Sequence, residues 1–193
     1  MRLGLVGSND SGKEILLNYL EKHAIEKNHF NSNRKETEHD EYFVVVKQIP
    51  IKIKAFLANS LGDFINSVEK INFLDAIILT LNIKNDNLLE QYKQEEFKEF
   101  CKILSFEGFS VLTAINIGSS PPPRINRDDL INISKELNLL YCFEITNDKE
   151  DLLEFYEKIF NDFIFKFQYS SSELFDKAKK YGNFLLKINT NGN

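Results

Sequence analysis

Apolar residues along this chain fall into two alternating patterns, short continuous runs and helix-spaced stripes. Continuous apolar runs are typical of strands buried inside a parallel sheet, because both faces of such strands are covered. Three runs of this kind occupy residues 2–6, 76–81 and 110–116, and residues 141–145 predict the last strand. Residues 41–48 and 51–57 are also rich in β-forming residues, and together they predict an antiparallel hairpin at one edge of the sheet.

Between these strands, apolar residues recur every three to four positions, which predicts helices with one buried face. The predicted helices cover residues 14–26, 87–106, 128–139 and 148–167, with shorter helical segments at 63–72 and 173–181. Thr146 or Asn147 is expected to cap the helix at 148–167. Residues 27–40 are polar without a period and predict a mobile loop. Strands that alternate with helices predict an α/β fold, with a mostly parallel sheet and helices on both faces.

Composition narrows the functional classes. A chain of 193 residues suits one compact domain with a short appendage. The net charge of −5 argues against nucleic acid as the main partner, because phosphate contacts need clustered Lys and Arg. Cys101 and Cys142 stand apart and are expected to be free thiols of a cytoplasmic protein. No apolar run reaches the length of a membrane-spanning helix and no lipidation motif is present, so no membrane anchor is expected.

The most specific motif, G-x-x-x-x-G-K, lies between the first predicted strand and the first predicted helix. It comprises Gly7, Ser8, Asn9, Asp10, Ser11, Gly12 and Lys13, followed by Glu14. The glycines allow backbone N–H groups to converge on a phosphate, the lysine adds positive charge, and the helix start adds its dipole. The motif normally continues with Ser or Thr, whose hydroxyl binds Mg²⁺. Here Glu14 and Asp10 place negative charge beside the predicted phosphate site, which weakens the electrostatic case for a triphosphate.

On this motif and on the order of strands and helices, residues 1–167 resemble the Ras-like small GTPases, including the Rab, Arf and Rag branches. The resemblance implies the three-layer α-β-α fold of P-loop NTPases, with a mostly parallel six-stranded sheet and one antiparallel edge strand. It divides the chain into a small GTPase-like P-loop domain at 1–168 and a polar C-terminal tail at 169–193 with one short helix. The cofactors it implies are GTP or GDP, with Mg²⁺.

The other motifs of that family are degenerate in this sequence. The D-x-x-G motif falls at residues 59–62, where Asn59 replaces the carboxylate, and Asp63 takes the place of the glutamine that positions water. The guanine-reading N-K-x-D motif falls at 116–119 and keeps only Asn116. The S-A-K-like loop falls at 144–147, with Thr146 as its counterpart. Ser32 and Thr37 lie where the family senses the γ-phosphate. By resemblance, the nucleotide-binding residues are 7–14, Asn116 and Thr146, and the candidate metal ligands are Glu14 or Asn59.

These departures leave two functions open. The first is a nucleotide-binding regulatory switch with weak or absent GTP hydrolysis, because hydrolysis needs a metal, an oriented water and charge stabilisation on the γ-phosphate. The second is a pseudo-GTPase that acts as a non-catalytic protein-binding subunit or scaffold. In either case the resemblance implies an effector or regulatory protein as partner. It also implies that the chain can form a homodimer or a heterodimer. A P-loop nucleotide kinase fits less well, since four arginines do not supply a phosphate-clamping lid.

Overall fold

The computed structural model describes residues 1–30, 39–67, 74–84, 92, 94–103, 105–116, 125–146 and 148–191 of the chain. Its centre is a seven-stranded sheet with the strand order β2-β3-β4-β1-β5-β6-β7. The strands are β1 (Arg2–Val6), β2 (Glu26–Phe30), β3 (His39–Val46), β4 (Ile49–Ala58), β5 (Ala76–Asn82), β6 (Phe109–Asn116) and β7 (Tyr141–Thr146). Strand β3 runs antiparallel to both of its neighbours, whereas the other pairs are parallel.

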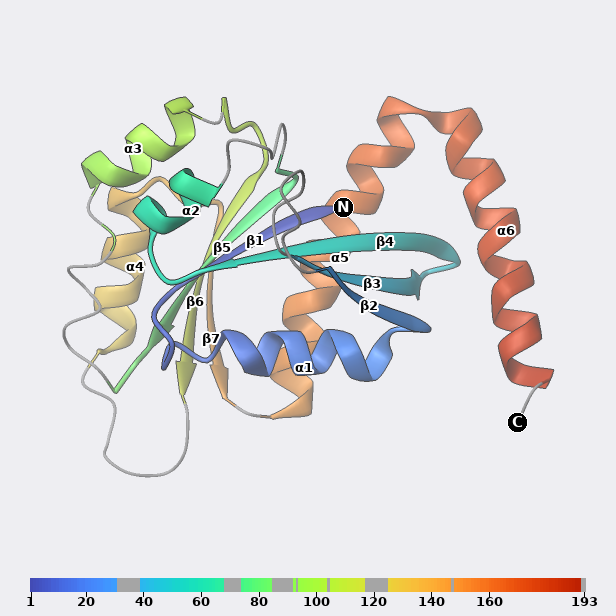
Figure 1. Cartoon of the computed structure of the whole chain (residues 1–193), viewed down its shortest axis with the longest axis horizontal. Helices are drawn as coiled ribbons and strands as arrows, with labels where there is room; N and C mark the ends of the chain where they lie inside the picture. The colour runs from blue at the N-terminus through green and yellow to red at the C-terminus, as the bar shows by residue number, and fades with distance from the viewer. Residues whose placement is uncertain are drawn as a thin grey trace.

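Helices cover both faces of this sheet (Figure 1). On one face, α1 (Lys13–His23) and α5 (Lys149–Ser170) pack their apolar stripes against the strands. On the other face lie α2 (Leu61–Ser67), α3 (Gln94–Ile103) and α4 (Arg127–Glu136). Strand β1 is in the middle of the sheet and is buried from Leu3 to Val6, so the loop that follows it opens at the centre of the carboxyl-end edge.

The α/β class, the buried strands at 2–6, 76–81 and 110–116 and the 41–57 hairpin predicted from the sequence are confirmed. The strand predicted at 141–145 is also present, as the edge strand β7, but only Ile145 in it is buried. The predicted count of six strands is wrong, because residues 26–30 form β2 and pair antiparallel with β3. Residues 26–29 are exposed in this edge strand and therefore lack the apolar alternation that identifies a half-buried strand. The predicted 27–40 loop thus begins with a strand, and its remaining residues 31–38, with Ser32 and Thr37, lie outside the described part of the chain.

Two helix ends also differ from the prediction. Helix α1 stops at His23, and the cap of α5 is Asp148, whose carboxylate accepts a hydrogen bond from the Glu150 N–H, instead of Thr146 or Asn147. The short helix predicted at 173–181 is α6 (Ser172–Asn191), which is 20 residues long. Helix α5 continues without a break through position 168.

Helix α6 crosses the tip of the β3–β4 hairpin (Figure 1). The hairpin turns at Lys47 and Gln48, both in the left-handed region with φ of 48° and 69°. The backbone of α6 approaches this turn so closely that a Cβ on Gly182 would lie 1.9 Å from the Gln48 carbonyl oxygen. Only glycine therefore fits at position 182. No helix among the described residues is long and apolar enough to cross a bilayer.

Candidate phosphate-binding loop and its surroundings

The loop between β1 and α1 requires both of its glycines. Gly12 has a φ of 88° and is the N-cap of α1, a left-handed conformation that favours glycine. A Cβ on Gly7 would lie 2.2 Å from the Thr80 hydroxyl oxygen, so this position has no room for a side chain. The Gly7 N–H donates to the Ala58 carbonyl at 3.1 Å and the Ser11 N–H donates to the Ser8 carbonyl at 3.1 Å. The loop is therefore a defined turn at the front of the helix.

Buried hydroxyls fix the loop to the sheet from below. The Ser11 and Thr80 hydroxyl oxygens are 2.7 Å apart, and Thr80 donates to the Val6 carbonyl at 3.1 Å. The Tyr92 hydroxyl lies within hydrogen-bond distance of the same carbonyl, at 2.8 Å, and of the Thr80 carbonyl, at 3.0 Å. These contacts could not be predicted from the sequence, since Thr80 lies within an apolar strand pattern and Tyr92 at an apolar position of a helical pattern.

Lys13 folds back over the loop. Its side chain is 6% exposed, and its ammonium is in hydrogen-bond contact with the Gly7 carbonyl. Three more oxygens surround it: the carbonyls of Ser8 at 3.2 Å and Ala58 at 3.1 Å, and Asn59 Oδ1 at 3.1 Å. Burial lowers the pKa of Lys13, and the charges of Glu14 and Asp10 oppose this shift. An ammonium has three protons, so a phosphate oxygen entering here would exchange with one of these oxygens.

A hollow of about 370 Å³ lies beside Lys13 and is lined by Asn9, Lys13, Glu14, Leu57, Ala58, Asn59 and Asp63. The structure therefore brings together Glu14, Asn59 and Asp63, which the sequence singled out from three separate segments. Asn59 Oδ1 accepts from Lys13, and the Asp63 N–H donates to Ser60 Oγ at 3.0 Å. Among the described residues, no group of three His, Cys, Asp or Glu side chains could hold a metal ion. Glu14 and Asp63 could supply two carboxylates to a cation in the hollow.

Two acidic residues, Asp10 and Glu14, lie at the solvent side of the loop. The Asp10 carboxylate accepts a hydrogen bond from the Ser8 hydroxyl at 2.5 Å, and its backbone carbonyl accepts one from Asn82 at 3.0 Å. Asn9, Asp10 and Glu14 are exposed. An anion bound over the loop would therefore meet negative charge at its solvent side.

Asn116 and Thr146 lie side by side at the carboxyl ends of β6 and β7, where they are register partners. Asn116 Oδ1 is buried, and no hydrogen-bond donor within the described chain reaches it. Thr146 differs, because both its N–H and its hydroxyl donate to the Asp151 carboxylate, at 2.9 Å and 2.5 Å. Asn116 is thus open to a ligand N–H, whereas Thr146 serves to fix the start of α5.

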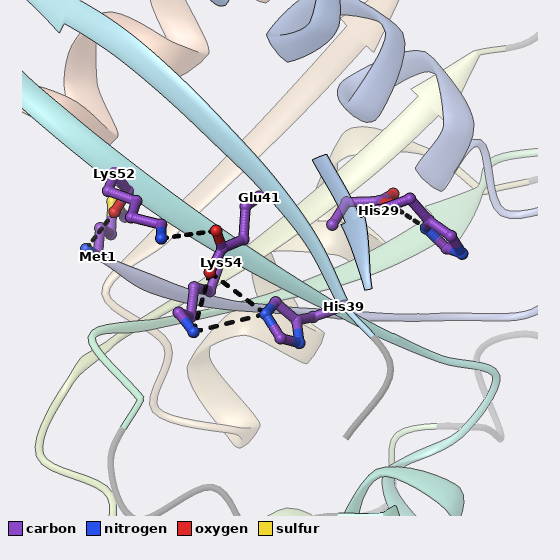
Figure 2. A network of polar contacts seen from close by, with 7 residues as sticks. Met1, His29, His39, Glu41, Lys52 and Lys54 are labelled. Atoms are coloured by element: carbon purple, nitrogen blue, oxygen red, sulfur yellow. Dashed lines mark hydrogen bonds and ion pairs between the residues drawn. The ribbon is translucent and has the colours of Figure 1, made fainter. Parts of the chain in front are cut away.

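A second polar cluster lies on β3 and β4, on the face opposite α1 (Figure 2). The buried Glu41 carboxylate pairs with Lys52 at 2.6 Å and Lys54 at 2.9 Å, and with the buried His39 ring at 3.4 Å. Burial alone would raise the pKa of Glu41, but the hydrogen bonds from the two lysines outweigh it and lower the pKa to about 2. This cluster could not be predicted from the sequence, because its members are spread over two strands.

No family model matches the chain, and no curated protein is similar to it. The resemblance to small GTPases therefore rests on the motif at residues 7–13 and on the order of the elements. The α/β fold with a mixed seven-stranded sheet stands independently of that resemblance.

Proposed function

We propose that this protein is a divergent, small-GTPase-like regulatory switch that binds GTP or GDP at the loop of residues 7–13 and hydrolyses GTP weakly or not at all. The observation that carries the proposal is the buried Lys13 ammonium folded over a glycine-bounded turn between the central strand and α1. In its active form such a switch would act on an effector or regulatory protein.

The start of α1 supports phosphate binding. The backbone N–H groups of Gly12, Lys13 and Glu14 precede the first intrahelical hydrogen bonds and have no acceptor within the helix. Together with the helix dipole, such groups favour an anion at this end. Phosphate oxygens placed there would also lie near the Lys13 ammonium. The buried and unpartnered Asn116 Oδ1 supports a base with an N–H group at the neighbouring strand ends.

The residues around the hollow disfavour hydrolysis. Asn59 supplies a neutral amide and contacts Lys13, so it offers a weaker hold on Mg²⁺ than a carboxylate would. Glu14 and Asp63 bring two negative charges to the place where the terminal phosphate and the attacking water would meet. Like charges there raise the energy of a transition state whose negative charge must be stabilised.

The purified protein provides the main test. Nucleotide released by heat denaturation would be identified by chromatography, and binding of fluorescent GDP and GTP would be titrated with Mg²⁺ and with a chelator. We expect binding that Lys13→Met weakens at least tenfold, with Lys22→Ala on the exposed surface of α1 as the matched control. Equal binding by the wild type and Lys13→Met would contradict the proposal.

The pseudo-GTPase alternative has its own supporting observation, since the Lys13 ammonium already contacts four protein oxygens and needs no phosphate for its stability. Glu14→Thr separates the two functions, because it removes a charge and restores a hydroxyl that can bind Mg²⁺. For a switch, this variant should bind GTP·Mg²⁺ more tightly than the wild type. For a pseudo-GTPase, neither protein should bind nucleotide or gain thermal stability from it.

A further inference from the structure

A groove follows the outer edge of β7, the last strand of the sheet. Strand β6 pairs with the inner side of β7, and none of the described strands pairs with its outer side. The groove has a volume of about 310 Å³ and is lined by Arg127, Leu130 and Ile131 of α4, residues 142–144 of β7, and Asp151 and Glu154 of α5. Helices α4 and α5 cover opposite faces of the sheet, so a hollow that both of them line lies across the outer edge of β7. We call it the β7 groove.

The backbone of β7 directs hydrogen-bonding groups into this groove. Successive residues of a strand point their N–H and C=O groups to opposite sides. The Thr146 N–H points away from β6, since it donates to the Asp151 carboxylate at 2.9 Å. Cys142 and Glu144 alternate with Thr146 in the same way, and so their N–H and C=O groups also point outward. These two residues are the positions with which an added strand could pair.

The α4 side of the groove is apolar and nearly neutral. Leu130 and Ile131 belong to its wall, and the Cys142 side chain lies on the same side, with Sγ 3.8 Å from the Leu130 carbonyl oxygen. Glu144 follows Cys142 by two residues and therefore points to the same face of the strand. Its negative charge is balanced there by the positive charge of Arg127. This side of the groove is therefore suited to apolar side chains.

The α5 side of the groove is acidic. Phe143 packs on this side, and the carboxylates of Asp151 and Glu154 line it. A carboxylate has about four lone-pair sites, and the Thr146 N–H and hydroxyl use two of those on Asp151. Asp151 thus keeps its charge and can accept further hydrogen bonds. This side of the groove is therefore suited to Lys or Arg.

We propose that the β7 groove binds an extended segment of a partner protein, which adds a strand to the outer edge of β7 and in which basic and apolar residues alternate. Side chains of an added strand point in turn to the two faces of the sheet. The apolar side chains of the segment would lie against α4, and its Lys or Arg side chains against α5. Backbone pairing supplies affinity in such complexes, and the side-chain contacts supply specificity. The pairing uses no residue of the loop at 7–13, so it is independent of nucleotide binding.

A second copy of this chain fits the groove less well than a basic segment does. Two copies joined through β7 would bring the three carboxylates of each groove close to those of the other, against one guanidinium, Arg127, in each. Like charges that face each other across paired strands are destabilising. The cations nearest the beginning of β7 do not remove this excess. Lys158 is already paired with Asp162 at 3.3 Å, and Lys135 lies outside the groove lining.

The Cys142 thiol does not make the groove a reactive site. Burial raises the pKa of this thiol, the charge of Arg127 opposes the shift, and the charge of Glu144 adds to it. A thiol that stays protonated is a poor nucleophile. The groove is therefore suited to reversible binding and not to covalent chemistry.

Fluorescence polarisation with a labelled synthetic peptide tests the groove in the full chain, without nucleotide. The peptide alternates Lys with Val over about eight residues, slightly more than the length of β7. We expect saturable binding at low ionic strength that weakens as salt is added, because the charges of the groove are partly exposed. A matched peptide with Glu in place of Lys should not bind. Failure of the Lys–Val peptide to bind, or equal binding of both peptides, would overturn the proposal.

Charge reversal on α5 tests the acidic side. Glu154→Lys should weaken binding of the Lys–Val peptide about tenfold, because it replaces an attraction by a repulsion. Glu157→Lys changes the net charge by the same amount, but Glu157 lies on the side of α5 near Tyr19 of α1, so binding should be unchanged. Equal losses in the two variants would mean that the peptide is attracted by overall charge and does not occupy the groove.

Glu144→Pro tests the backbone pairing. Proline removes the outward N–H and should leave the bonds between β7 and β6 intact. Binding should be about fivefold weaker than in Glu144→Gln, which loses the charge and keeps the N–H. Circular dichroism checks that both variants fold. In the wild type, amide hydrogen exchange at Cys142 and Glu144, followed by NMR, should slow when the peptide binds; unchanged exchange in the bound state would refute strand addition even if Glu144→Pro does not fold.

Discussion

Replacement of the buried Glu41 by Gln should destabilise the protein at neutral pH and remove part of its acid sensitivity. The Glu41 carboxylate accepts hydrogen bonds from Lys52 and Lys54 at 2.6 and 2.9 Å and faces His39 at 3.4 Å. Burial opposes the charged form, but the two lysines outweigh burial and lower the pKa from 4.5 to about 2. Gln keeps the shape of the side chain and cannot balance two ammonium groups.

The size of the effect follows from that shift. A fall in pKa from 4.5 to about 2 corresponds to an upper bound of about 3.4 kcal/mol of folding free energy. Lys52 is 58% exposed and Lys54 is 35% exposed, so solvent screens both interactions. We therefore expect a loss of about 1–2 kcal/mol for Glu41→Gln near neutral pH. Since the folded pKa lies below the unfolded one, this stabilisation is complete above about 4.5 and disappears as the pH falls toward 2.

Urea unfolding, followed by circular dichroism at several pH values between about 7 and 2.5, measures this difference. The curves of the wild type and Glu41→Gln should be separated at neutral pH and converge at the acid end. Glu99→Gln, on the exposed face of α3, is the matched control and should change stability by less than about 0.5 kcal/mol. The reasoning fails if Glu41→Gln is as stable as the wild type near pH 7, or if the two proteins remain equally separated at the lowest pH.

The close packing of glycines and of one tyrosine leads to three more predictions. Gly12→Ala should cost more than about 1 kcal/mol in urea unfolding, since φ is 88° and the new Cβ would lie 2.9 Å from a neighbouring side chain. Gly62→Ala should be nearly neutral, since its Cβ would be in ordinary van der Waals contact, 3.8 Å from the Ser60 hydroxyl. Gly182→Ala should release α6 from the hairpin, because the Cβ would lie 1.9 Å from a carbonyl oxygen, and limited proteolysis should then cut α6 faster than in the wild type. Tyr92→Phe should lose about 1–2 kcal/mol of unfolding free energy, as its hydroxyl contacts two buried carbonyls at 2.8 and 3.0 Å; an unchanged midpoint would contradict that contact.

The core strands could be predicted from the sequence because strands that are buried on both faces consist of continuous apolar runs. Strand β5 shows this, since every residue of Ala76–Asn82 except the last is buried. Strand β2 could not be found in this way. Glu26 to His29 are exposed, and the strand is held by backbone pairing with β3, which leaves no trace in side-chain polarity.

Helix α6 shows a second limit of the sequence pattern. Gly182 reads as a helix end, and its neighbours are polar enough to read as a tail. In the folded chain Gly182 is an interior helical residue whose missing side chain lets the hairpin approach. Such a contact joins residues more than 130 positions apart, and therefore it cannot be predicted from a local sequence pattern.

Part of the candidate site was also predictable. The loop at residues 7–13 could be identified from the G-x-x-x-x-G-K spacing, and the two glycines of this motif, Gly7 and Gly12, are those that the structure requires. The partners of Lys13 were not predictable, because the Ala58 carbonyl and Asn59 reach it only through the pairing of β4 with β1. The role of Asp151 in holding Thr146 was likewise hidden, since it depends on where α5 starts.

The hydroxyl contacts beneath the loop have a consequence for association. Ser11 is tied to Thr80, Gly7 to Ala58 and Asp10 to Asn82, so hydrogen bonds to β4 and β5 fix the shape of the loop. A ligand that enters it need not order the backbone, and little conformational entropy is lost when the complex forms. Under the proposed function, such preorganisation would offset part of the repulsion from the acidic side chains nearby. Thr80→Val removes the hydroxyl that contacts Ser11 and Val6, and should then weaken nucleotide affinity in the fluorescence titration.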